Sequence, residues 1–146
     1  MHHFYLILHL IAACVWVGGH LILLIRFLPQ AIKNNSPEII ISFEKKYEII
    51  GIPSLLIQIV TGILMAYHYN VGINKWFKFE SQIENVISIK LILLFITFLL
   101  AFHARIFIIP KLNKDNLKQL AWHILLINLV AIAMLVLGSF IRFGGI

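Results

Sequence analysis

The sequence predicts an all-α integral membrane protein: one bundle of four transmembrane helices, with a short interfacial helix before the second span. Two observations predict this class. First, 61% of the 146 residues are hydrophobic and only 12% are charged, whereas a soluble domain carries about 25% charged residues. Second, four apolar runs reach the roughly 20 residues that a helix needs to cross about 30 Å of hydrocarbon. They cover residues 4–28, 51–69, 86–109 and 120–141.

These runs are long and do not alternate between polar and apolar residues, so they do not suit the strands of a membrane barrel. Helices satisfy their own backbone groups in lipid, and we therefore expect four of them in a single domain over residues 1–146. Pro29 is expected to end the first helix and Pro110 the third, because proline interrupts helical hydrogen bonding.

A short interfacial helix is expected between the first and second spans. Ser36-Pro37-Glu38 resembles a helix start, with a Ser cap, Pro at the first helical position and an acid in the first turn. Apolar residues then recur at helical spacing up to Ile50, with charged residues between them. A break near Gly51 or Pro53 should separate this helix from the second span.

The first run is expected to be a retained span. Ile11-Ala12-Ala13-Cys14 resembles a lipoprotein cleavage box. However, no Lys or Arg precedes it, and the apolar run continues beyond it. A signal peptide has a basic start and a short apolar region.

The net charge of +6 is concentrated near the span ends, so it indicates membrane topology and no nucleic-acid surface. The loops on one side carry eight basic residues: Arg26, Lys33, Lys45, Lys46, Arg105, Lys111, Lys114 and Lys118. The other side carries four: Lys75, Lys78, Lys90 and Arg142. The positive-inside rule therefore predicts a multi-pass protein of a bacterial-type inner membrane with both termini outside.

Histidines inside the predicted spans sort into two layers. Eleven residues separate His9 from His20, which brings both rings to one helix face. Counted at about 1.5 Å per residue from each span's midpoint, His9 and His68 fall about 10 and 12 Å to the outer side. The inner layer, about 6 to 11 Å to the other side, contains His20, His103 and His123. Ionisable residues in a span usually face a bundle interior or a cavity.

The residue types in these layers favour an imidazole-bound cofactor. Neutral imidazole suits haem iron, copper and zinc. All six acidic residues lie outside the spans, which disfavours a carboxylate-based ion carrier. Four cations near the two layers could meet haem propionates or lipid headgroups: Lys90 and Arg142 on the outer side, and Arg26 and Arg105 on the inner side.

The chain also resembles two families. Leu8-His9-Leu10 through Trp16-Val17-Gly18-Gly19, then Leu28-Pro29 and Lys90-Leu91, are similar to CopD-type copper resistance membrane proteins. The His9-x6-Trp16-x-Gly18 element, Glu44-Lys45-Lys46 and Lys90 also resemble HemJ-type protoporphyrinogen oxidases. The first resemblance implies copper uptake or tolerance. The second implies a bound haem b and porphyrinogen oxidation, with His9 and Lys90 as the matching functional positions.

Three functions follow as hypotheses. The first is a haem b- or metal-binding membrane protein with a redox role, holding one or two haems. The alternatives are copper transport or tolerance of the CopD type and HemJ-like porphyrinogen oxidation. The lipid bilayer is the expected partner, and a membrane or periplasmic redox partner and a homo-oligomer are left open. If one cofactor binds, we expect the inner layer, because Gly18 and Gly19 would let a planar ring approach the first helix beside His20.

Overall fold

The computed structural model describes residues 2–146, and the regular structure in that range is helical. Four helical segments of the described chain are long and apolar enough to cross a membrane: His3–Asn34, Glu38–His68, Gln82–Lys111 and Leu117–Ile141. The predicted all-α bundle with four spanning helices is confirmed. Each segment begins before the predicted run, and the first and third also end after it, because the helices continue into the polar residues that flank it.

The first segment does not end at Pro29. Helix α1 (His2–Ile22) passes through one π turn (Leu23–Phe27) into α2 (Leu28–Asn34). In the π turn the Leu28 N–H donates to Leu23 O, five residues back. Pro29 then falls in the first turn of α2, a position where the missing N–H is tolerated. The segment ends at Asn35, which adopts the left-handed conformation typical of a helix C-terminus.

The predicted separate interfacial helix is wrong, because α3 (Glu38–His68) is continuous through Gly51 and Pro53. A break there would expose unpaired backbone groups to lipid, which costs more than one proline inside a helix. The neighbouring Ser54 hydroxyl donates to Ile50 O at 2.7 Å, within the same turn as Pro53. The Ser36 cap was also predicted wrongly: its hydroxyl donates to a Glu38 carboxylate oxygen at 2.6 Å.

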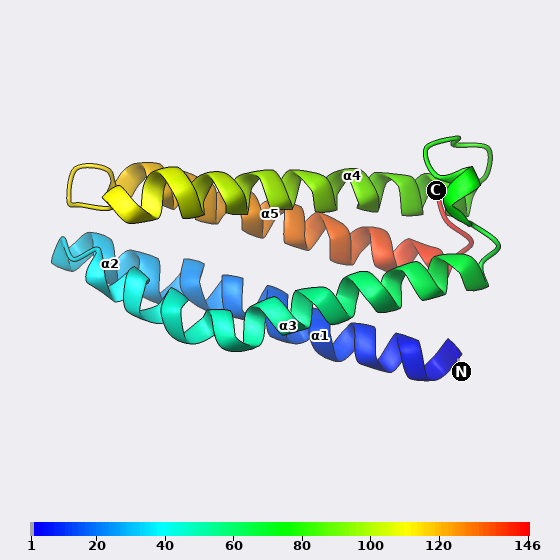
Figure 1. The fold of residues 1–146 in the computed structure, drawn as a ribbon, viewed down its shortest axis with the longest axis horizontal. Helices are drawn as coiled ribbons and strands as arrows, with labels where there is room; N and C mark the ends of the chain where they lie inside the picture. Colours follow the sequence, from blue (N-terminus) through cyan, green and yellow to red (C-terminus); the bar gives the residue numbers. More distant parts are fainter. Residues whose placement is uncertain (1) are drawn as a thin grey trace.

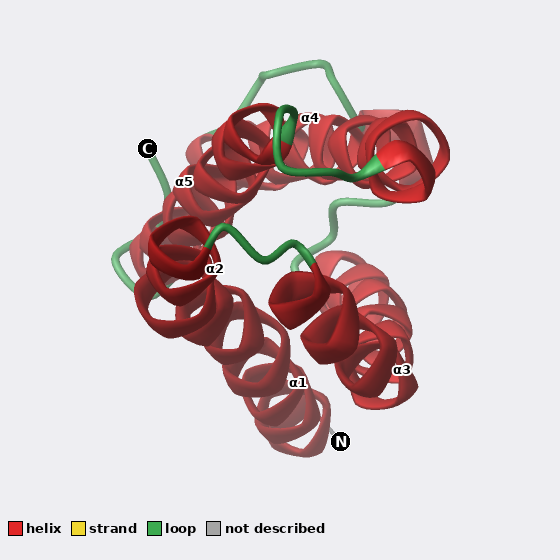
Figure 2. Ribbon diagram, turned by 90° about the vertical axis from the view of Figure 1, so that its left-hand side faces the viewer, coloured by secondary structure: helices red, strands yellow, loops and turns green. Residues whose placement is uncertain are grey.

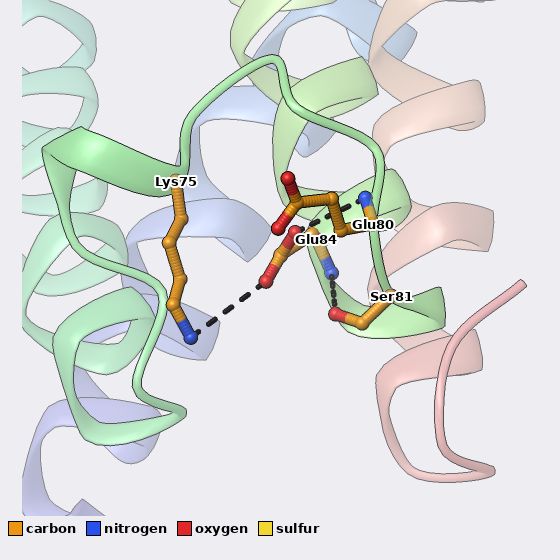
Figure 3. A network of polar contacts seen from close by, with 4 residues as sticks. All are labelled: Lys75, Glu80, Ser81 and Glu84. Carbon is orange, nitrogen blue, oxygen red and sulfur yellow. Dashed lines mark hydrogen bonds and ion pairs between the residues drawn. The ribbon is translucent and has the colours of Figure 1, made fainter.

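Residues 69–81 join α3 to α4 (Gln82–His103) and contain one 3-10 turn (Ile73–Lys75). Glu84, in the first turn of α4, organises this loop from a buried position (Figure 3). Its carboxylate accepts from the Glu80 N–H at 3.2 Å and lies 3.8 Å from Lys75 Nζ. The Ser81 hydroxyl caps the helix by accepting from the Glu84 N–H. The loop is thereby fixed against the helix that follows it.

The third segment ends much as the first does. After α4 comes a second π turn (Ala104–Ile108), then a 3-10 turn (Ile109–Lys111) that contains Pro110. Helix α5 (Leu117–Ile141) completes the bundle. His20 and His103 therefore lie just before the two π turns, and π turns are frequent at functional sites.

Packing links the helices in the order α3, α1, α5 and α4, with few close contacts between α3 and α4 (Figure 2). Both chain termini lie at the same end as the 69–81 loop, which we name the terminal end (Figure 1). The opposite end, with the 35–37 and 112–116 loops, is named the basic end. Its core contains Leu23, Ile40, Ile108 and Leu120.

Large apolar side chains cover the outer surface of the bundle. Exposed examples come from every spanning segment, including Ile25, Ile49, Phe95 and Leu129. A soluble monomer rarely exposes apolar surface on this scale, whereas lipid tails cover it without cost. The bundle is therefore suited to a lipid bilayer.

Candidate functional site

His9 is held against α3 through its hydrogen bond to Thr61. Its Nδ1 lies 2.9 Å from the hydroxyl oxygen of Thr61, a buried residue. The Thr61 hydroxyl donates its own proton to Ile57 O at 2.6 Å, so its oxygen accepts from the His9 Nδ1–H. In a neutral ring, Nε2 then carries the lone pair. Gly62 lies beside the ring, where an added Cβ would be 3.4 Å from His9 Cε1.

Lys90 reaches the same region from α4. Its ammonium lies over the α5 backbone, where a Cβ added at Gly138 would be 3.4 Å from Nζ. It is close enough to His9 for a Coulombic interaction. Within residues 3–146 it forms no hydrogen bond or ion pair. We name this group the His9–Lys90 site: His9, Thr61, Gly62, Lys90 and Gly138. It gathers residues from all four spanning segments.

The two histidines of the outer layer, His9 and His68, have different neighbours in the structure. His68 was expected to pair with His9 because both fall at a similar depth. The structure gives His9 the Thr61 hydroxyl as its hydrogen-bond partner, whereas the exposed His68 ring lies edge-on to Tyr69 with centroids 5.9 Å apart. The two rings lie at similar depth but do not hydrogen-bond to each other, because depth does not fix the rotation of a helix about its axis.

His20 lies in an aromatic cluster at mid-bundle. Its Nδ1–H donates to Trp16 O at 2.8 Å. The Trp16 ring lies 4.6 Å from the imidazole and the Tyr47 ring 5.6 Å, measured between centroids. Asn128 donates from Nδ2 to His20 O at 3.1 Å and to Ile124 O at 2.8 Å. The imidazole therefore has close protein neighbours from α1 and α3, while its carbonyl is held by α5.

Tyr47 occupies the space that Gly19 opens. A Cβ at Gly19 would lie 2.1 Å from Tyr47 Cε2, and one at Gly51 would lie 2.7 Å from Cε1. The Tyr47 hydroxyl donates to Trp16 O at 2.8 Å. By contrast, a Cβ at Gly18 would meet nothing within 4 Å. The ring beside Gly19 is thus a side chain of the protein, and the expected approach of a cofactor ring beside His20 stays a prediction.

The other two inner histidines form a pair at the basic end. His103 Nδ1 and His123 Nε2 lie 3.0 Å apart, and the rings stack with an interplanar angle of 8°. Neither ring is part of the aromatic cluster around His20. Within the described part of the chain, no group of three or more His, Cys, Asp or Glu side chains could hold a metal ion. The three inner histidines thus form two separate groups.

The predicted cations have different surroundings. Arg105 forms an ion pair with Glu48 of α3. Arg26 and Arg142 are exposed. Only Lys90 combines partial burial with the lack of an anionic partner among the described residues. The sequence predicts roles for Lys90 and His9 but none for Thr61 or Tyr47. The stripe Ser54, Gln58, Thr61 at helical spacing was the signal for Thr61.

Comparison with known proteins adds no family: no protein-family model, curated protein or solved structure matches the chain.

Proposed function

We propose that the protein is a membrane haem b protein with a redox or electron-transfer role, and that His9 would hold the haem iron. The observation that supports this best is the His9–Lys90 site. It combines the lone pair of a neutral imidazole, whose ring is held by the Nδ1–Thr61 hydrogen bond, with a nearby ammonium that lacks an anionic partner among the described residues. Histidine ligands typically donate their other ring N–H in this way.

The residues of this site fit the group. The Thr61 oxygen accepts from Nδ1 and so fixes which ring nitrogen is available. Lys90 offers a cation to a carboxylate, and haem carries two propionates. A partly buried ammonium in a membrane span is costly without such a partner. Haem b, when bound, supplies one-electron redox chemistry, while the chain's own residues bind and orient it.

The aromatic cluster offers less room for a cofactor. The space beside Gly19 is filled by the Tyr47 ring, and His20 lies between Trp16 and Tyr47. These contacts favour His9 over His20 as the ligand, in contrast to the sequence-based expectation for the inner layer. That expectation stays a prediction until cofactor content is measured.

Visible absorption tests the proposal directly. Protein purified in mild detergent should show a Soret band and a pyridine haemochrome of haem b. The variant His9→Ala should lose most of the haem, whereas His103→Ala should keep it. His68→Ala is the matched control, because it removes an exposed histidine of the same outer layer. Absence of haem from the wild-type protein, or full haem content in His9→Ala, would refute the assignment.

Porphyrinogen oxidation is the second candidate, and the proximity of His9 to Lys90 favours it specifically. The HemJ resemblance implies functional roles for these two positions, and here they lie within Coulombic range. Lys90 would orient a carboxylate of the porphyrinogen. The variant Lys90→Met should then impair turnover more than haem content, and gene loss should cause porphyrin to accumulate. Normal haem synthesis after gene loss would exclude this role. The copper alternative is supported by the CopD resemblance alone.

The orientation follows from the charges. We infer a bacterial-type inner membrane with the basic end in the cytoplasm and the terminal end outside. In a Cys14→Ser background, a cysteine at Asn74 should react with an impermeant thiol reagent in intact spheroplasts. A cysteine at Asn113 should react only after the membrane is opened. The reverse pattern would overturn this topology.

A further inference from the structure

The histidine pair at the basic end has no role in the proposed haem site. His103 is the last residue of α4 and His123 lies in the second turn of α5. Their ring centroids are 5.0 Å apart, and the short contact joins His103 Nδ1 to His123 Nε2. Two helices are therefore connected through ring nitrogens, at a point separate from His9 and His20.

The hydrogen bonds fix where the protons lie. His123 Nδ1 is 3.1 Å from Gln119 O, and a carbonyl only accepts, so this nitrogen carries the proton. His123 Nε2 consequently has a lone pair, which accepts from the His103 Nδ1–H. A neutral imidazole has two tautomers, so the His103 proton can lie on Nε2 instead of Nδ1. Its Nδ1 then offers a lone pair as well.

The spacing of the two nitrogens matches two ligands of one ion. Zn²⁺ binds imidazole nitrogen at about 2.0–2.1 Å, which places two such ligands about 2.9–3.4 Å apart. The observed separation is 3.0 Å. An ion could therefore replace the shared proton once the rings rotate so that both lone pairs point to it. The Gln119 carbonyl already provides the outer hydrogen bond that ligating histidines typically make.

We propose that His103 and His123 form an open, two-imidazole site for a borderline divalent metal ion of the Zn²⁺ class. The remaining coordination positions would be left open for water or another ligand. The nearby cation Arg105 is already engaged by Glu48, which reduces its repulsion of an incoming ion. The π turn that starts at Ala104, directly after His103, is a local irregularity of the kind found at functional sites. Bound metal would clamp α4 to α5 at the basic end.

Calorimetric titration of Zn²⁺ into the detergent-purified, tag-free protein tests this site. His103→Gln and His123→Gln should each weaken the binding at least about tenfold, since loss of even an outer hydrogen bond costs that much. The double variant should bind no more weakly than either single variant, because one ligand alone cannot chelate. His68→Gln is the matched control and should bind as the wild type does. His9→Gln should also retain Zn²⁺ binding, which separates this inference from the haem proposal.

Independent surface histidines would give another result. Each replacement, His68→Gln included, would then remove a similar share of the binding, and the double variant would lose twice as much. That outcome, or unchanged binding in both single variants, would overturn the site. Mapping of histidine modification by diethyl pyrocarbonate provides a readout without variants. Zn²⁺ should protect His103 and His123 but leave His68 reactive, and equal reactivity of all three would also overturn the proposal.

Discussion

The substitution Gly19→Ala should displace Tyr47 from its place between α1 and α3. The added methyl group would lie 2.1 Å from Tyr47 Cε2 and 2.4 Å from Cζ. These are ring atoms flanked on their other side by Gly51, so the ring cannot shift without a change in the packing of the two helices. The hydroxyl would also lose its hydrogen bond to Trp16 O.

The expected loss of unfolding free energy is about 0.5–4.5 kcal/mol, the sum of the three contributions that follow. Inserting a methylene into a packed interior costs about 1–3 kcal/mol, and a lost hydrogen bond adds about 0.5–1.5 kcal/mol. The higher helix propensity of alanine returns up to about 1 kcal/mol. Gly18→Ala gains the same propensity without a clash, since nothing lies within 4 Å of its added Cβ. That variant should be neutral or slightly stabilised.

Unfolding of the two variants in mixed dodecyl maltoside and dodecyl sulfate micelles, followed by circular dichroism, measures this difference. A double-mutant cycle makes the cause specific. In a Tyr47→Ala background the clash is absent, so Gly19→Ala should then cost little. Equal stabilities of Gly18→Ala and Gly19→Ala, or an unchanged cost of Gly19→Ala without the tyrosine ring, would refute the reasoning.

Three further predictions concern other contacts and use the same unfolding assay. Glu84→Ala should lower the unfolding free energy by about 2–3 kcal/mol, because the Glu80 N–H loses its acceptor and Lys75 loses its ion-pair partner. Lys75→Met should lower it by no more than about 1 kcal/mol, since this lysine is partly exposed. A cost for Lys75→Met as large as that for Glu84→Ala would contradict this assignment. Asn128→Leu should lower the unfolding free energy by about 0.5–2 kcal/mol, because the hydrogen bond to His20 O is lost. An unchanged unfolding free energy would mean that this bond contributes nothing to stability. Pro53→Ala should leave the helical content unchanged, because residues 38–68 are already one helix. A rise in helical content would mean that the wild-type helix is broken near Pro53, as the sequence predicts.

The candidate site was predictable in composition but not in arrangement. His9 and Lys90 could be selected because ionisable residues in a span are costly and therefore usually functional. Their mutual proximity depends on how α1 and α4 rotate against α5, which hydropathy does not encode. The same applies to the inner layer. His103 and His123 meet because they face one another across α4 and α5, while His20 faces Trp16 and Tyr47.

The sequence by itself determined the class of fold, since long apolar runs must be helices where no water can satisfy the backbone. It could not determine the continuity of α3, because Pro53 ends a helix in water but is tolerated where a break would face lipid. Nor could it show that the Tyr47 ring fills the space beside Gly19. That outcome depends on the approach of α3 to α1, and only side-chain packing between helices fixes such an approach.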